Sequence, residues 1–391
     1  MDKYTTYVGM DVHARSITAR AMVKETGETF SKRFTNCPSA EEVASWLSSL
    51  PQPIYCAYES GCTGTHLARD LRELGFDCDV IAVSTLARSN KDKKGKCDKH
   101  DAKAILREIL NPMTSYSTVW VPDKQAEADR SLARAYRDAV DECKRAKQKL
   151  ESFLLLYGFI WNEKSAKGGL KKTFTRTWWS WVGDISFEEE SANEALAYYI
   201  RRVKDAETEV KMMKEQVERA AQDARNAAYI DAFCYLKGMS VISAFIARVE
   251  FGDFTRFSSG RKVSCWTGVV PSNSSSGERE AHGRITKAGN STLRRTLVEG
   301  VSTIATWTNP KKSKESSGGA SAAVETMASD ANARLLARYK HLTQDNHLYH
   351  NKAKIAVVNE YVRWVWAIGC QVQLEQEHKE KLEHCAKETN L

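Results

Sequence analysis

The sequence lacks the features that mark membrane and disulfide-stabilised proteins. Its 391 residues include only 7 prolines, which is not the composition of a disordered chain. No apolar run approaches the roughly 18 residues that a membrane span needs. A basic, then apolar, then small-residue signal is also missing from the N-terminus. The ten cysteines are scattered without a Cys-x-x-Cys pair, so neither a zinc site nor a disulfide framework is indicated. We therefore expect a cytoplasmic protein with no membrane partner and with reduced cysteines.

The sequence does carry a surplus of positive charge, and that surplus is local. The net charge is +8. The length of 391 residues allows two or three domains, and the composition of 42% hydrophobic and 28% charged residues is that of a folded chain. The basic residues of the two main clusters are Lys91, Lys93, Lys94 and Lys96, and then Lys164, Lys167, Lys171, Lys172 and Arg176. Such clusters favour a polyanionic partner, and solvated charged loops are the alternative.

Residues 1–118 have the pattern of an α/β domain. Strands are predicted at Tyr7–Val12, Ser16–Val23, Thr29–Phe34, Ile54–Glu59 and Cys78–Val83, and helices at Ala40–Ser49, Thr65–Leu74 and Asp101–Leu110. Three strands, a helix, and then strands alternating with helices is the order of an RNase H-like sheet. In that order the first strand is central and the fourth lies beside it.

Residues 119–228 are predicted to form a helical coiled-coil linker. Apolar residues recur at alternating spacings of four and three, in one stripe from Leu132 to Tyr157 and in a second from Leu196 to Ala224. The two helices are long enough to form a hairpin, a dimer seam, or both. Between the stripes, a basic loop leads into Trp178, Trp179 and Trp181. These rings either stack on nucleic-acid bases or cap the end of a hairpin.

Residues 229–391 form the third, mostly helical region. A turn centred on Gly238 and the apolar helix after it resemble a helix-hairpin-helix element, which can present backbone N–H groups to a DNA phosphate. The polar stretch 309–335 is interpreted as a loop or insertion. The run "KIAVVNEYVRWVWAIGCQV" predicts a buried amphipathic helix.

Four acidic residues occupy places where a metal site is expected. Asp11 interrupts the apolar run "YVGMDVH", and a buried carboxylate needs a cation or a hydrogen-bonding partner. Glu59 ends the fourth predicted strand, and Asp98 and Asp101 lie on one face of the next helix. Four such oxygen ligands suit Mg²⁺, and two ions could stabilise attacking and leaving oxygens in phosphoryl transfer. Singly, each acid also fits a strand edge, a loop or a helix cap.

A serine cluster lies in the third region. Its serines are Ser272, Ser274, Ser275 and Ser276, in "PSNSSSGERE". No Ser-His-Asp spacing is evident, but the cations Arg279, Arg284, Lys287, Arg294 and Arg295 could hold a phosphodiester near these serines. A polar turn is the alternative.

These motifs carry a family resemblance that spans nearly the whole chain. "YVGMDVHARSITA", "CAYESGCTGTHLARDLRELGFDCDVIA" and "KCDKHDAKAI" resemble the N-terminal domain of the RuvC-like Asp-Glu-Asp-Asp transposases of the one-ten insertion-sequence family. "LKGMSVISAFIARVEFGDFTRFSSGRKVSCWTGVVPSNSSSGERE" and "GRITKAGNSTLRRTLVEG" are similar to the C-terminal transposase domain of that family.

The resemblance implies a bacterial, nucleoid-associated recombinase. Asp11, Glu59, Asp98 and Asp101 match the metal-binding acids, and Ser276, with Ser275 as second choice, matches the serine that links covalently to DNA. The family pairs the metal site of one subunit with the serine of another, which implies a homo-oligomer, a dimer that assembles to a tetramer on DNA. It also uses a structured noncoding guide RNA, the bridge RNA, to choose DNA sites.

Four functional hypotheses follow from the sequence. The leading one is an Mg²⁺-dependent, RNA-guided DNA recombinase that works through a phosphoserine intermediate. A hydrolytic RNase H-like junction nuclease would need only the acids, and an actin-like kinase usually has glycine after the first-strand aspartate, where Val12 stands here. A non-catalytic nucleic-acid scaffold would leave the four acids unexplained.

Overall fold

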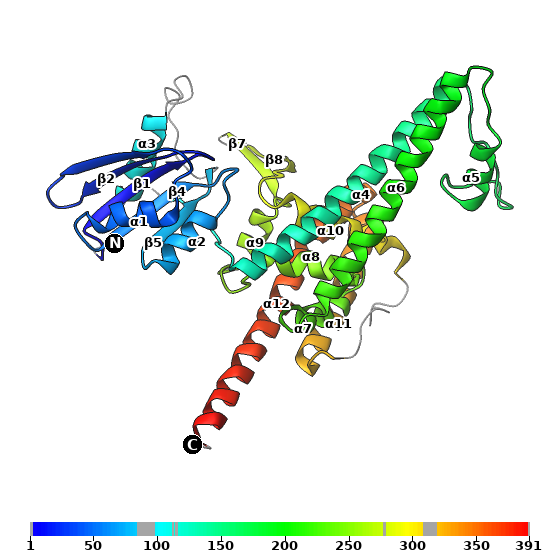
Figure 1. Cartoon of the computed structure of the whole chain (residues 1–391). Helices are drawn as coiled ribbons and strands as arrows, with labels where there is room; N and C mark the ends of the chain where they lie inside the picture. The colour runs from blue at the N-terminus through cyan, green and yellow to red at the C-terminus, as the bar shows by residue number, and fades with distance from the viewer. Residues whose placement is uncertain are drawn as a thin grey trace. The chain divides into compact units, whose positions relative to one another are not determined.

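The computed structural model describes residues 3–83, 98–111, 113, 116–276, 279–307 and 319–389, with backbone alone at 98–100, 273–276, 279–282 and 385–389. These residues divide into two compact units, Met1–Gln125 and Ala126–Leu391 (Figure 1). Along this described part of the chain, no helix is both long and apolar enough to cross a membrane.

The first unit is a six-stranded sheet with helices on both faces. Its strands are β1 (Thr6–Val12), β2 (Ile17–Val23), β3 (Thr29–Phe34), β4 (Ile54–Glu59), β5 (Asp77–Ile81) and β6 (Thr118–Val119), and its helices are α1 (Ala40–Ser48), α2 (His66–Glu73) and α3 (Asp98–Leu110). The strand order is β3-β2-β1-β4-β5-β6. The prediction that the first strand is central and lies beside the fourth is therefore confirmed, and β6 is the strand of this sheet, as described, that the sequence pattern missed.

Strict alternation divides the side chains of this sheet between two cores. Val8, Met10, Cys56 and Tyr58 pack with residues of α1 and α2, whereas Tyr7 and Ala57 pack with the α3 residues Ile105, Leu106 and Ile109. This follows from the two-residue period of a strand. Figure 1 shows α3 on the opposite side of the sheet from α1 and α2.

The second unit consists mainly of helices. They are α4 (Lys124–Leu156), which begins just before the unit boundary, α5 (Arg176–Gly183), α6 (Glu190–Ala221), α7 (Ala224–Cys234), α8 (Val241–Phe251), α9 (Gly260–Trp266), α10 (Ser291–Val301), α11 (Ala322–Lys340) and α12 (His350–Thr389). A two-stranded sheet of β7 (Pro271–Ser276) and β8 (Arg279–Ile285) interrupts them.

The two predicted heptad stripes lie on α4 and α6, which run side by side as a long hairpin with α5 at its far end (Figure 1). Leu150 and Leu154 of α4 share a buried cluster with Leu196 and Val203 of α6. The hairpin alternative thus holds within one chain. The second stripe ends earlier than predicted, because α6 stops at Ala221 and the Asp223 side chain caps the separate helix α7.

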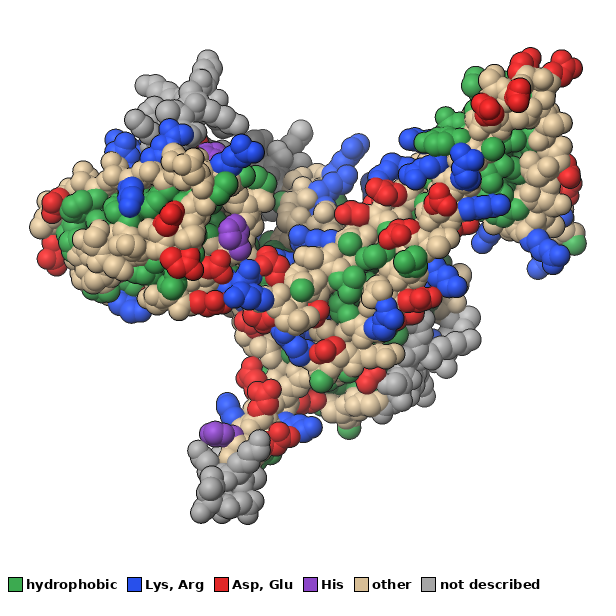
Figure 2. Space-filling model, viewed as in Figure 1, with side chains coloured by type: hydrophobic (Ala, Val, Ile, Leu, Met, Phe, Trp, Pro, Cys, Tyr) green, Lys and Arg blue, Asp and Glu red, His purple; other side chains and the backbone are tan. Residues whose placement is uncertain are grey.

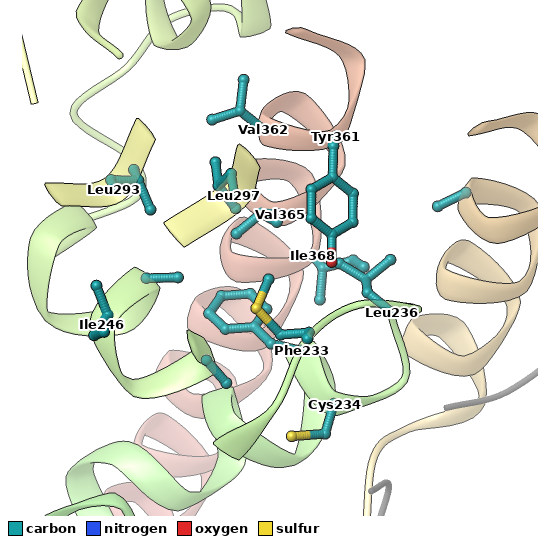
Figure 3. Packing of buried hydrophobic residues seen from close by; sticks show 14 of the residues in the cluster. Phe233, Cys234, Leu236, Ile246, Leu293, Leu297, Tyr361, Val362, Val365 and Ile368 are labelled. Atoms are coloured by element: carbon teal, nitrogen blue, oxygen red, sulfur yellow. The ribbon is translucent and has the colours of Figure 1, made fainter. Parts of the chain in front are cut away.

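The largest core joins α7, α8, α10, α11 and α12. Phe233, Ile246, Leu297 and Val365 lie within it, and Figure 3 shows such side chains meeting from α7, α8, α10 and α12. The predicted buried C-terminal helix is confirmed by α12, of which Tyr361 and Ile368 are fully buried.

The stretch 309–335 is not the loop that we expected from its polarity. Residues 308–318 lie outside the described residues, but α11 begins at Ala322 and buries Val324, Ala328 and Leu335 in the core. Polar residues separate the buried positions of α11, and the buried Asn332 is polar itself, so the apolar face is inconspicuous in the sequence.

Candidate active site

Asp11 and Glu59 lie at the ends of two neighbouring strands. β1 and β4 are parallel, and Met10 pairs with Tyr58, so the next residue on each strand is one of the two acids. Residues in register on parallel strands project from the same face of the sheet. The Asp11 side chain is 16% exposed, and its Oδ2 lies 3.0 Å from Nε2 of His13. The fold thus brings together two carboxylates that are 48 positions apart in the sequence.

Both acids belong to the face of the sheet that α3 covers. Tyr7, Gly9 and Asp11 alternate along β1, and a Cβ on Gly9 would lie 2.5 Å from both the Ala102 carbonyl oxygen and the Leu106 nitrogen. Glycine therefore lets the backbone of α3 approach β1 directly. Sequence reasoning missed Gly9, although a glycine inside a strand often marks such close backbone approach.

The other two predicted acids lie in the first turn of α3. Asp98 is the first residue of the helix, and Asp101 directly precedes Ala102, whose carbonyl lies over Gly9. The side chain of Asp98 lies outside the described residues, and Asp101 is exposed. Asp101 is therefore next to the segment of α3 that lies over Gly9, two residues before Asp11 on β1.

The donors in this region are carboxylates, which are the ligands that Mg²⁺ prefers. Among the side chains that the structure describes, no three of His, Cys, Asp or Glu are close enough to hold a metal ion. The described part of the site therefore supplies two strand carboxylates, Asp11 and Glu59. His13, the residue that follows β1, lies against Asp11.

The serine cluster lies on a strand and not in a polar turn. β7 and β8 pair in antiparallel register, with Ser275 opposite Glu280 and Ser276 opposite Arg279. Ser276 is the last residue of β7, directly before residues 277–278, which lie outside the described part. The side chains of Ser275, Ser276 and Arg279 are not described, so their choice as nucleophile and phosphate contact stays a prediction.

Two of the cations that were predicted to contact DNA, Arg294 and Arg295, form hydrogen bonds within the protein. Arg295 donates to Asp141 at 2.6 Å and to Glu299 at 3.1 Å, and these partners raise its pKa, the Asp141 hydrogen bond most of all. Arg294 donates to the Thr267 carbonyl at 2.8 Å. These two arginines therefore hold the helical unit together.

The remaining predicted cations are exposed, weakly paired or outside the description. Lys171 lies 3.4 Å from Glu163. Lys172, Arg176, Arg284 and Lys287 are exposed. Lys91, Lys93, Lys94 and Lys96 lie outside the described residues.

Trp178 is a core residue, which corrects its prediction as a nucleic-acid contact. Its ring is 1% exposed and packs in the cluster of Leu150, Leu154 and Val182 at the end of the hairpin. This is the capping alternative, and a buried ring is not available to stack on a base. Trp179 is half-buried, with the Lys204 ammonium 5.8 Å from its ring centre.

The predicted helix-hairpin-helix element is present as α7, a turn and α8. Gly238 has a φ of +81° in that turn, a value that glycine adopts readily. The Lys237 N–H donates to Asn332 Oδ1 at 2.8 Å, so this amide is bound within the protein. Gly238 itself is exposed.

An α/β unit with carboxylates at two strand ends, followed by a helical unit, is consistent with an enzyme that acts on nucleic acid. Comparisons with known proteins identify the family. Residues 8–159 match a model of the DEDD transposase domain of IS110 elements, described as a transposase. Residues 231–317 match the model described as the transposase IS116/IS110/IS902 family.

Individual relatives agree with these models. The chain is 31% identical over 330 residues to the transposase for insertion sequence element IS1111A of Coxiella burnetii, covering 79% of this chain and 80% of the relative. It is 29% identical over 382 residues to the putative transposase y4qE of Sinorhizobium fredii, covering 94% and 89%. The chain therefore belongs to the IS110/IS116/IS902 family of transposases, and this membership implies an enzyme that cleaves or recombines DNA.

Proposed function

We propose that this protein is an Mg²⁺-dependent, RNA-guided DNA recombinase that joins itself to DNA through a serine. The observation that carries the proposal is the in-register placement of Asp11 and Glu59 at the ends of parallel strands under α3. The central first strand and its neighbour β4 also support an RNase H-like, RuvC-like first unit. Its family membership supplies the DNA substrate.

Asp11, Glu59, Asp98 and Asp101 would hold Mg²⁺, as two ions, whose charge would stabilise the negative charge that develops on phosphodiester oxygens. The side chains that surround the ions have their own tasks. Asp11 is fixed by its strand and by His13, and Glu59 by the adjacent strand. Rigid strands keep the carboxylates in place, which reduces the cost of reorganisation during the reaction.

In the proposed covalent step the nucleophile is Ser276, with Ser275 as second choice. The serine Oγ forms a bond to phosphorus, and the serine proton passes to a general base. The bond from phosphorus to one deoxyribose oxygen breaks, and that oxygen takes up a proton. Rejoining reverses these bond changes with a new DNA hydroxyl, so no net hydrolysis occurs. A guide RNA from the element would choose the DNA ends, and exposed cations such as Arg284 and Lys287 would bind backbone phosphates.

The test is a denaturing gel of the full chain with Mg²⁺, DNA carrying the element's end and the noncoding RNA encoded beside it. We expect a covalent protein–DNA band that is lost in Ser276→Ala and in Asp11→Ala. Loss in Ser275→Ala instead would move the nucleophile by one residue. Free cleaved ends that persist in the double serine variant would favour the hydrolytic nuclease, because the acids alone suffice for hydrolysis.

A further inference from the structure

A groove runs between α4 and α6 near the end of their hairpin. Its residues are distant in the sequence from the predicted acids and from the serine cluster. Its volume is about 720 Å³. Residues of α4 and α6 line it, among them Arg145, Lys149, Phe153, Tyr198, Tyr199 and Arg202. Figure 2 shows Lys and Arg side chains gathered beside hydrophobic ones along this hairpin.

The groove carries a surplus of positive charge. Arg145, Lys149 and Arg202 are exposed, and the acidic lining residue Glu142 forms only a long contact with Arg145, at 3.8 Å. Within the described residues, Lys149 and Arg202 form no ion pair and no side-chain hydrogen bond. Their charges are therefore left for a partner with negative charge.

A series of aromatic rings leads from the hairpin core to the surface of the same groove. Phe153 lies 5.1 Å from Tyr199, and Tyr199 lies 5.4 Å from Tyr198, measured between ring centres. Tyr198 is 51% exposed, which is unusual for a large ring that could have been buried in the adjoining cluster. Tyr199 supports the Tyr198 ring and is itself packed against Phe153, so the exposed face of Tyr198 is presented on an aromatic support.

We propose that this groove binds an unpaired DNA strand, with Lys149 and Arg202 on phosphates and Tyr198 stacked on a base. Cations beside a supported, exposed ring are the two elements that single-strand binding combines. A duplex offers phosphates but keeps its bases stacked, so it would leave Tyr198 unused. An apolar partner helix would use the rings but would leave the three cations buried without partners, which is costly. This inference rests on the proposed function, because strand cleavage by a recombinase would leave unpaired DNA for the groove to hold.

The experiment is fluorescence anisotropy of the full chain with a fluorescein-labelled deoxythymidine 20-mer in EDTA. Binding needs neither the acids nor the serines, so its outcome is independent of the proposed chemistry. The double variant Lys149→Gln, Arg202→Gln should weaken binding at least tenfold. It should also reduce the slope of log affinity against log salt by about 1.4, since each phosphate contact on a single strand contributes about 0.7.

The aromatic contribution has its own variant pair. Tyr198→Ala should weaken binding about fivefold or more with an unchanged salt slope, because stacking contributes roughly 1–3 kcal/mol per base. Tyr198→Phe should bind as the wild type does. Tyr349→Ala removes a ring elsewhere that is even more accessible, 82% exposed, and should have no effect.

The matched control for charge is the double variant Lys144→Gln, Lys211→Gln, which removes two exposed cations of the same hairpin outside the groove lining. Equal losses in the two double variants would reduce the groove to nonspecific charge and overturn the proposal. So would a groove-dependent preference for duplex DNA or for an RNA 20-mer over the DNA 20-mer. Photocrosslinking with 5-bromodeoxyuridine should place the adduct on the peptide carrying Tyr198, and an adduct confined to other peptides would also overturn it.

Discussion

At the scale of single residues, Gly9 controls the site although it carries no functional group. A methyl group there would meet the backbone of α3 at 2.5 Å, at the Ala102 oxygen and the Leu106 nitrogen. Backbone atoms cannot turn away as a side chain can, so Gly9→Ala must displace the helix whose first turn holds Asp98 and Asp101. We expect a destabilisation of about 1–3 kcal/mol, typical of overpacking. The covalent DNA band should fall by more than the loss of folded protein explains.

The matched control is Gly61→Ala in the same unit, where an added Cβ would meet nothing within 4 Å and φ is not positive. Thermal unfolding followed by circular dichroism measures both variants. Equal midpoints for Gly9→Ala and the wild type would show that α3 does not press on β1 as described.

The placement of single residues shows how far the sequence could lead. Asp11 and Glu59 were predictable because strand alternation and strand order fix where an acid at a strand end must lie. The contact of His13 with Asp11 depends on a rotamer, which spacing does not specify. Trp178 was ambiguous because a large ring beside cations suits both a base and a hairpin core, and only its burial decides between them.

At the scale of elements, α4 and α10 are joined by a network of two arginines and two carboxylates. Arg137 donates to both Glu299 oxygens at 2.9 and 3.0 Å, while Arg295 bridges Glu299 and Asp141. The Arg295 hydrogen bond lowers the pKa of Asp141. Burial raises the pKa of Glu299, but its hydrogen bonds and attraction to Arg137 and Arg295 outweigh burial, and the pKa ends below its ordinary value.

A lowered carboxylate pKa gives this network a defined pH dependence. Unfolded Asp and Glu titrate near pH 4, so the stabilisation is fully present at pH 7 and is lost as pH falls below about 5 through the folded pKa values. Exposed ion pairs contribute about 1 kcal/mol or less each, so Arg295→Gln should lower the unfolding temperature at pH 7 by roughly 2–4 °C. At acidic pH the difference from wild type should shrink.

Differential scanning calorimetry across pH 3–7 measures this difference. The control is Arg201→Gln, which removes an exposed arginine of α6 that forms no ion pair within the described residues, and it should leave the temperature unchanged at every pH. A destabilisation by Arg295→Gln that stays constant from pH 7 to pH 3 would contradict the role of the two carboxylates.

Elements were predictable where the periodicity was strong. The strands β1 to β5, the hairpin helices and α12 all repeat apolar residues at the spacing of their structure. α11 was missed because Glu, Ser, Asp and Asn residues separate its buried side chains, and one of the buried residues, Asn332, is itself polar. The β7–β8 hairpin was missed because serine, asparagine and glycine are typical of turns, and pairing with a partner strand overrides that local preference.

At the scale of the whole molecule, the predicted acids and the predicted serine belong to different compact units. Asp11, Glu59, Asp98 and Asp101 lie in Met1–Gln125, and Ser276 lies in Ala126–Leu391. A complete reaction centre therefore needs two units, which can come from one chain or from two. The proposed recombinase takes them from two chains, and mixing inactive variants distinguishes these cases.

Consider a dimer of one Asp11→Ala chain and one Ser276→Ala chain, in which each site takes its acids from one chain and its serine from the other. One of the two sites then combines intact acids with an intact serine. A random mixture should then recover about a quarter of the wild-type covalent DNA band, because half the dimers are mixed and each has one of two sites complete. If acids and serine act within one chain, every site keeps a defect and no band returns. A mixture of Asp11→Ala with Glu59→Ala is the control, since every site then lacks one acid under either arrangement. Recovery in the first mixture alone would show that each reaction centre is assembled from two copies of the chain.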